Sequence, residues 1–498
     1  MERTYDILKN MDDKTFTFQP FILLTAMVFF LAFCMDTTAE TLRKPQYLFF
    51  LLAVFLVLFV FRQLVSISEP ALILLAGVLL RTSYILYTAI WTRQHDVVDF
   101  GTGEGHAGYI EYIYSNLRLP SGDPRNIWAF FQPPLHHIIA GLWMRFCAHF
   151  QLAYRQVQEN VQLLTLFYIC SVTVLTFFIC KELKLKSWGI RVVLLIVCTH
   201  PALTIMAGSI NNDALSLMFA MLAVYLIILW YKHPSFRLII MFALSIGASM
   251  MAKLSGGTIA PAVAALFILK LVKDRSNIRK YIAQFIVFAI IVFPIGIWWE
   301  IRNMIKYDMP FNYIPGVGEQ FDVPLLQRIF DIRMHSVYPA MTVNGDAYNE
   351  YNVPLTLFKT SLFDDANLSN VSGSLTLFAV ILFITALILA VISLIATFLI
   401  LTDRNGRYDM KPEHKLLFGV LYMTLLIAYL SFAFGSHNYS AMNFRYIALT
   451  IPVEAIFLGI FTDACRNKQH IRFRLFAACV LGFAAAAAST YLMLGVVS

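Results

Sequence analysis

The chain has 498 residues, of which 59% are hydrophobic and 14% are charged, and its mean hydropathy is +0.69. An average soluble domain carries about 25% charged residues, so this composition excludes an ordinary soluble protein. The net charge of +8 does not indicate nucleic-acid binding, because Lys and Arg gather in the cytoplasmic loops of membrane proteins. Apolar stretches that reach the roughly 20 residues needed for a membrane-crossing helix recur along the chain. The sequence therefore predicts an all-α polytopic membrane protein.

Thirteen stretches are predicted to span the membrane, in a helical bundle with two large loops on the non-cytoplasmic side. They are residues 20–35, 46–63, 70–90, 161–180, 189–208, 213–231, 238–252, 257–272, 281–299, 373–402, 415–434, 444–463 and 475–496. No small-residue cleavage site follows the first stretch, so it is interpreted as a retained helix and not as a signal peptide.

Residues 134–150 are also apolar, but they are predicted to form a surface or re-entrant helix. When they are not counted as a span, the clusters of Lys and Arg between later spans all fall on the cytoplasmic side, as the positive-inside rule requires. These clusters are Lys181/Lys184/Lys186, Lys232/Arg237, Lys273/Arg275/Arg279/Lys280, Arg404/Arg407/Lys411/Lys415 and Arg466/Lys468/Arg472/Arg474. The segments 91–160 and 300–372 then face the other side, and the helices that they carry are expected to lie beside the membrane.

This topology divides the chain into four parts. Residues 1–69 are an N-terminal addition of transmembrane helices, and residues 70–299 are a core that includes the first external loop, 91–160. Residues 300–372 form the second external loop, and residues 373–498 supply the C-terminal transmembrane helices.

A polar island at residues 91–133 follows directly on an apolar stretch. It contains the carboxylates Asp96, Asp99 and Glu104, together with two histidines. Charged groups beside a membrane helix are costly, so their concentration here predicts chemistry at the membrane surface. The alternative is a solvated acidic loop. The glycines of the island do not match the G-x-G-x-x-G turn that follows a strand, which argues against nucleotide binding.

Five motifs along the chain resemble those of the GT-C superfamily of membrane glycosyltransferases, which includes protein O-mannosyltransferases and the lipid A aminoarabinose transferase. The resemblance covers about residues 80–465. In chain order the motifs are the acidic island with His106-x-x-Tyr109, Leu119-Pro120 and Gln132-Pro133-Pro134-Leu135; Asn211-Asn212-Asp213 after His200-Pro201; Met251-Ala252-Lys253-Leu254-Ser255-Gly256; Trp299-Glu300-Ile301-Arg302-Asn303; and Phe444-Arg445-Tyr446 with Pro452.

The resemblance implies an inverting transfer of a sugar from a polyprenyl-phosphate donor to a hydroxyl of a glycan, lipid or protein acceptor. A hydroxyl nucleophile needs a general base, and a positioned carboxylate contributes roughly 10²–10⁴-fold. Many relatives carry Asp-Glu shortly before the histidine, where this chain has Thr102 and Gly103. The base is therefore assigned first to Asp96, which lies closest to the helix end, then to Asp99 and then to Glu104.

The leaving phosphate calls for cations, and arginine suits it because its fork matches two phosphate oxygens. The residues expected to bind substrate are His106, Tyr109, Gln132, His136, Lys253, Arg302, Arg445 and Tyr446. A snorkelling interfacial role is the alternative for Lys253 and Arg445. Asn212 and Asp213 are interpreted first as a helix N-cap pair, with direct contact to the site as the alternative.

No His or Cys spacing is typical of a metal site, so no metal is assigned, and the expected cofactor-like ligand is the lipid-linked sugar donor. Structural or hydrogen-bonding roles are favoured for His106, His136 and His137, with a divalent metal as the alternative. The seven cysteines are interpreted as packing residues. The expected partners are the donor, the acceptor and membrane lipids, with no nucleic acid. The expected location is the plasma membrane of a bacterium, with the site on its outer face.

Three other functions compete with the enzyme. A transporter would place charges in the middle of its helices and show paired, interrupted helices in two halves, but the polar groups here cluster in loops and at helix ends. A flippase or polymer ligase for lipid-linked glycans would share the ligand and display basic residues within the spans. A membrane scaffold without catalysis is the third.

Overall fold

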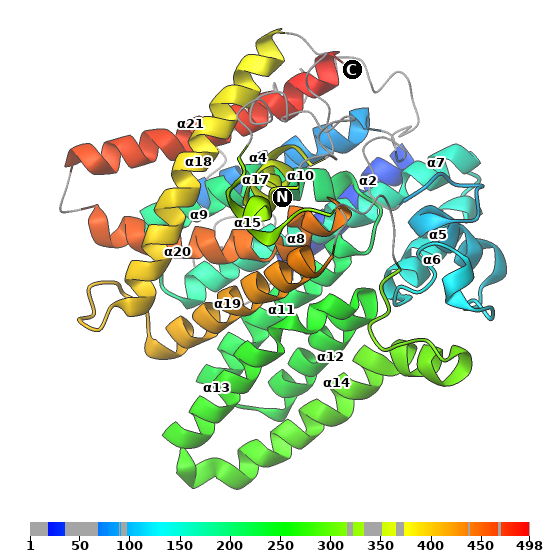
Figure 1. The fold of residues 1–498 in the computed structure, drawn as a ribbon, viewed down its shortest axis with the longest axis horizontal. Helices are drawn as coiled ribbons and strands as arrows, with labels where there is room; N and C mark the ends of the chain where they lie inside the picture. Colours follow the sequence, from blue (N-terminus) through cyan, green and yellow to red (C-terminus); the bar gives the residue numbers. More distant parts are fainter. Residues whose placement is uncertain are drawn as a thin grey trace, which may run out of the picture.

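The computed structural model describes residues 18–34, 68–88, 90, 97–315, 322–332, 351–364, 373–436, 439–466 and 470–497. Every regular element in these ranges is a helix, which confirms the prediction of an all-helical chain (Figure 1). Eight candidate spans pass the length and hydropathy test, or up to ten if each of two bent helix pairs counts as one span.

The thirteen expected spans divide into four groups. Eight correspond to α4 (Glu69–Tyr87), α8 (Val161–Glu182), α11 (Asp213–Lys232), α13 (Ala260–Lys273), α14 (Ile278–Tyr307), α18 (Gly373–Thr402), α19 (Pro412–Gly435) and α21 (His470–Val497). Two are bent pairs: α9 (Ser187–Thr199) with α10 (Pro201–Gly208), and Ser440–Ile447 with α20 (Thr450–Cys465). Two are the shorter helices α2 (Gln19–Cys34) and α12 (Phe236–Ala252), of 16 and 17 residues. The stretch 46–63 lies outside the described residues.

The centre of the bundle is built around α11. This helix packs against α8 on one side and α12 on the other, and α12 packs in turn against α14 (Figure 1). Small polar residues close the seam between α11 and α12, where the Ser249 hydroxyl donates to the Ser216 carbonyl at 2.9 Å and the two hydroxyls lie 3.1 Å apart. In an apolar medium such pairs let two backbones approach closely and satisfy each other's polar groups.

The first external loop folds into a compact helical unit. It contains α5 (Gly105–Asn116), the single turn η2 (Pro124–Asn126), α6 (Leu135–His149) and α7 (Tyr154–Glu159), and α5 packs on α6. Gly105 begins α5 at φ +69°, and a Cβ there would lie 2.3 Å from the Val97 carbonyl oxygen. Only glycine fits this position without moving the backbone. Residues 134–150, which were expected not to cross, form the helix α6, which is not among the candidate spans.

The helix α14 continues beyond residue 299, the expected end of the span, to Tyr307, so its last turns belong to the segment 300–372 that is predicted to form the second external loop. The described parts of this loop contain α15 (Leu325–Phe330) and α17 (Val353–Phe363). The end of α14 is joined to the first loop. The Trp299 indole donates to the Phe131 carbonyl at 3.0 Å, and the Tyr307 hydroxyl donates to the Ser121 carbonyl.

Candidate functional site

A cavity of about 760 Å³, here named the central cavity, lies among the parts of the chain that carry the motifs. The first external loop, the start of α11, the 3-10 turn η3 (Leu254–Ile259) after α12, the segment after α14, α19 and the turn η7 (Phe444–Ile447) all contribute to its wall. Five of the eight expected substrate-binding residues line it: His106, Gln132, Lys253, Arg445 and Tyr446. Its volume falls in the range of about 300–1,000 Å³ that is usual for small-ligand sites.

Two helix ends bring opposite charges together at the cavity. Asp213 is the first residue of α11, and Lys253 is the residue that caps the C-terminus of α12. A helix N-terminus stabilises an anion and a C-terminus stabilises a cation, each by about 0.3–1 kcal/mol. The Lys253 ammonium donates to Asp213 Oδ1 at 2.5 Å. Side chains of both residues are largely buried, so the pair is shielded from solvent.

Arg445 approaches the same carboxylate from the other side. It lies in η7, where the Asn443 side chain caps the turn by accepting from the Arg445 backbone N–H at 2.9 Å. Asn443 in turn donates to Asp364, the residue that ends α17. The second external loop thereby holds the turn that carries the arginine. Arg445 Nε lies 3.9 Å from Asp213 Oδ2.

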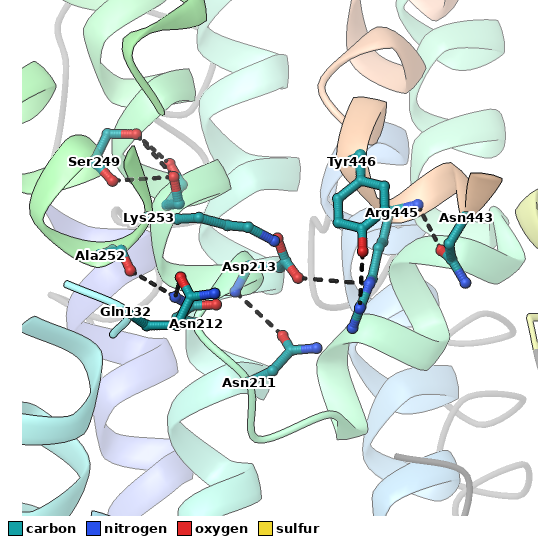
Figure 2. A network of polar contacts seen from close by, with 11 residues as sticks. Gln132, Asn211, Asn212, Asp213, Ser249, Ala252, Lys253, Asn443, Arg445 and Tyr446 are labelled. Carbon is teal, nitrogen blue, oxygen red and sulfur yellow. Dashed lines mark hydrogen bonds and ion pairs between the residues drawn. The ribbon is translucent and has the colours of Figure 1, made fainter. Parts of the chain in front are cut away.

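Asp213, Lys253 and Arg445 are named the charged triad, and Figure 2 shows the carboxylate between the two cations. Tyr446 completes the group. Its ring centroid lies 4.9 Å from Lys253 Nζ and 5.1 Å from Arg445 Cζ, so both cations lie within cation–π distance of the same ring. The Arg445 guanidinium also donates to the Tyr446 hydroxyl at 3.3 Å. The tyrosine therefore helps to keep two like charges close together.

A stack of rings supports His106 from behind the wall. His106 Nδ1 lies 2.9 Å from His137 Nε2, and the two rings are parallel within 3°. His137 stacks on Tyr109 at 4.0 Å, and Tyr109 stacks on Phe130 at 4.5 Å. Burial lowers the pKa of His137 and raises that of Tyr109, because desolvation penalises the charged form of each ring. Tyr109 is fully buried and does not line the cavity, although it was expected to bind substrate.

His136 and Gln132 form hydrogen bonds with the turn that leads into α11. His136 Nε2 lies 2.7 Å from the Ile210 carbonyl oxygen, to which it donates, and Gln132 Oε1 accepts from Asn212 at 3.3 Å. Burial lowers the pKa of His136 to about 4, so the ring is neutral at pH 7. Of these two expected binding residues, Gln132 lines the cavity, whereas His136 is fully buried and is not among the lining residues.

The rest of the wall is mainly apolar and aromatic. Trp128, Phe131 and Tyr313 come from the two external loops. Leu425, Ala428 and Phe432 come from α19, one of the candidate spans, so the cavity extends from the charged triad toward membrane-spanning helices. Such a site can hold an anionic group at one end and an apolar group at the other.

Two of the three expected base residues, Asp99 and Glu104, are not among the residues that line the central cavity. Asp99 is exposed and faces a separate hollow that Val97 and Gln158 also line, and Glu104 is exposed at the start of α5. Asp96, the first choice, lies outside the described residues. The identity of the base stays a prediction.

Arg302 lies in contacts that join two elements. Its guanidinium donates to the Pro120 carbonyl and to the Asn303 side chain, both at 2.6 Å, and stacks over Trp299 at 4.4 Å. Arg302 is not among the residues that line the cavity. Its assignment to substrate binding therefore stays a prediction without support from this geometry.

Two carboxylates of the site were not assigned to it from the sequence. Asp213 was interpreted first as half of an N-cap pair, but Asn212 is the N-cap residue of α11 and makes no side-chain cap bond, and the Asp213 side chain bonds to Lys253. The Asp213 backbone N–H donates to the Asn211 side chain at 3.1 Å. Glu300 also lines the cavity and accepts a hydrogen bond from the Asn312 backbone. For Asp213 a signal existed: a lysine and an aspartate at the ends of two adjacent apolar stretches are expected to pair. No group of three or more metal-ligating side chains occurs among the described residues.

No protein-family model and no curated protein matches the chain. Among solved structures it is similar to ArnT from Cupriavidus metallidurans bound to undecaprenyl phosphate, at a TM-score of 0.49 and 11% identity over 86% of this chain and 77% of that one. It is also similar to the Archaeoglobus fulgidus oligosaccharyltransferase in complex with Zn and sulfate, at a TM-score of 0.48 and 12% identity over 84% of this chain. The likeness covers 53% of the oligosaccharyltransferase, about half its length. Because both TM-scores are below 0.5, these similarities do not indicate which reaction this chain catalyses.

Proposed function

We propose that the protein transfers a sugar from a polyprenyl-phosphate donor to a hydroxyl of an envelope glycan, lipid or protein acceptor, on the non-cytoplasmic face of the membrane. The single observation that carries this proposal is the charged triad with Tyr446 at the wall of a cavity that is otherwise mainly apolar. Asp213 compensates only one of the two largely buried cations, and an uncompensated charge in such a cavity is expensive unless it meets an anionic ligand. A lipid-linked phosphate is an anion with a long apolar tail, and it matches both parts of the wall.

In this proposal Lys253 and Arg445 bind the phosphate of the donor. Arginine can contact two phosphate oxygens in a fork, whereas lysine acts as a point charge. Their hydrogen bonds strengthen as the phosphate departs and gains negative charge, which lowers the energy of the transition state. The isoprenoid tail lies along Leu425, Ala428 and Phe432 toward the membrane.

The sugar then occupies the part of the cavity near the first external loop. A carboxylate of that loop, first Asp96 and otherwise Asp99 or Glu104, takes the proton of the acceptor hydroxyl. The hydroxyl oxygen forms a bond to the anomeric carbon while the bond from that carbon to the phosphate oxygen breaks, and its electron pair stays on the phosphate. Since a phosphate is a weak base, its departure needs no second carboxylic acid, in contrast to glycoside hydrolysis.

The test uses purified protein and membranes from a strain that lacks it. Lipid-phosphate-linked sugars in those membranes are radiolabelled, the protein is added, and label is followed from the lipid fraction into acceptor fractions. Asp96→Asn is expected to slow the transfer by about 10²-fold or more, since it removes the base and keeps the shape of the side chain. Asp99→Asn and Glu104→Gln are the matched variants that identify the base.

Each outcome bears on a separate part of the proposal. Full transfer by all three loop variants would refute the choice of base and leave the donor class intact. No loss of lipid-linked label with the unaltered protein would refute the transferase. Movement of labelled lipid across the membrane with the sugar still attached would favour a flippase.

A further inference from the structure

The carboxylate of Asp213 occupies the position between Lys253 and Arg445 that an anionic ligand would be expected to take. It contacts Lys253 through Oδ1 and Arg445 through Oδ2, so each oxygen faces one cation (Figure 2). The aspartate side chain is 8% exposed, and so is that of Arg445. Asp213 is therefore a counter-ion that belongs to the protein itself.

The other charged or titratable groups around this carboxylate are few in the described ranges. His106 interacts electrostatically with Asp213, and its ring is hydrogen-bonded to His137. Glu300 lines the same cavity, but its carboxylate accepts from the Asn312 backbone. His136 lies behind the cavity wall, interacts electrostatically with Asp213 and is neutral at pH 7. The triad itself carries two positive charges and one negative charge, which leaves one net positive charge.

This net charge matters because the donor and the product of the proposed reaction differ in charge. A sugar-linked lipid phosphate is a phosphodiester with one negative charge. The lipid phosphate left after transfer is a phosphomonoester, which carries about −1.5 to −2 at pH 7 because its second pKa is about 6. A buried charge that lacks a partner is costly, so a site with one net positive charge suits the diester better than the dianion.

Resting on the proposed function, we propose that Asp213 sets the charge of the phosphate site so that it accepts a singly charged lipid phosphodiester and disfavours the doubly charged phosphomonoester. The carboxylate offsets one of the two cations when the donor binds. After transfer it repels the second charge of the departing phosphate, which favours release of the product. Asp213 is a specificity-determining residue in this scheme.

The test compares two short probes of equal tail length, farnesyl phosphate and methyl farnesyl phosphate. Their dissociation constants are measured on the detergent-purified full chain at pH 8, where the monoester is a dianion. Asp213→Asn keeps the size of the side chain and raises the net charge of the triad by one. The ratio of affinity for the monoester to affinity for the diester is expected to rise at least tenfold over the unaltered protein.

Three further variants make the result decisive. Glu300→Gln removes one negative charge from the same cavity without touching the triad, and it is expected to change the ratio less than threefold. Asp213→Glu keeps the charge and is expected to keep the ratio. Lys253→Gln leaves no net charge, and its ratio is expected to fall; this variant still tests the proposal if Asp213→Asn does not fold.

An unchanged ratio in Asp213→Asn, or an equal shift in Glu300→Gln, would overturn the role of Asp213. In either case the two probes would still bind, and the proposed function would stand. Absence of binding by both probes to the unaltered protein would instead refute the phosphate site on which the proposed function depends.

Discussion

Asp213 and Lys253 are expected to depend on each other for the stability of the fold. Their ion pair joins the first residue of α11 to the residue that caps the C-terminus of α12, next to the seam that Ser216 and Ser249 close. Removing one partner of a buried pair leaves the other charge without compensation and typically costs 3–5 kcal/mol. Here Arg445 still lies 3.9 Å from the carboxylate, so the loss is expected at the lower end, about 3 kcal/mol.

Lys253→Met is therefore expected to lower the melting temperature of the detergent-purified protein. Adding Asp213→Asn to it removes the uncompensated charge and is expected to recover most of the loss, because the double variant has lost the whole pair. Differential scanning fluorimetry on the single and double variants gives the coupling between the two residues. Additive melting-temperature changes would show that the two side chains act independently.

At the residue scale the sequence predicted the cations of the site better than its carboxylates. Lys253, Arg445 and Tyr446 could be selected because they belong to motifs that resemble those of the superfamily and lie on the predicted outer side, and all three line the central cavity. Asp213 could not be separated from a helix cap, since Asn and Asp at a helix start satisfy the cap equally well. Arg302 was selected by the same reasoning as Arg445, and only its position shows that it contacts Pro120.

At the scale of elements, α6 positions the turn before α11 through a buried histidine. His136 donates to the Ile210 carbonyl, and its neighbours include His137 on the same helix and Asp213 beyond the turn. Burial lowers its folded-state pKa to about 4 from the ordinary value of 6.5. Between these two values the unfolded chain binds more protons than the folded one, so stability falls as the pH is lowered.

The contribution of His136 is fully present above pH 6.5 and is lost as the pH falls toward 4. A shift of this size corresponds to a loss on the order of 3 kcal/mol. His136→Gln keeps a donor at the position of Nε2 but does not titrate, so its melting temperature is expected to fall less steeply between pH 6.5 and 4. Parallel curves for the two proteins across this range would contradict the assignment.

The positions of most helices could be predicted, whereas their breaks could not. Residues 189–208 were expected as one span, but the helix bends by 46° at His200-Pro201. Proline disfavours helical geometry in the residue before it, and Pro201 starts the next helix. Hydropathy averages over such a break, because both halves are equally apolar.

At the scale of the whole molecule, the clusters of lysine and arginine predict how the protein is oriented in the membrane. Gly122 lies in the first external loop, and Gly406 lies between α18 and α19. A Cβ at either glycine would meet nothing within 4 Å, so both loops can accept a short insertion.

A small epitope inserted at Gly122 is expected to react with antibody from the non-cytoplasmic face, and one at Gly406 only after the cytoplasmic face is opened. The measurement is antibody labelling of intact and permeabilised cells that produce each tagged protein. Each tag serves as the control for the other. Labelling of both tags from the same face would contradict the predicted topology.

The hydrogen bonds between the end of α14 and the first external loop have a consequence for how such proteins can diverge. Trp299, Arg302 and Tyr307 all donate to backbone carbonyls of that loop, at Phe131, Pro120 and Ser121 respectively. A loop taken from a relative would have to offer carbonyls at the same three places. Chimaeras that exchange the first loop together with the end of α14 should therefore be tolerated better than chimaeras that exchange the loop alone, and the two segments are expected to be inherited as a unit.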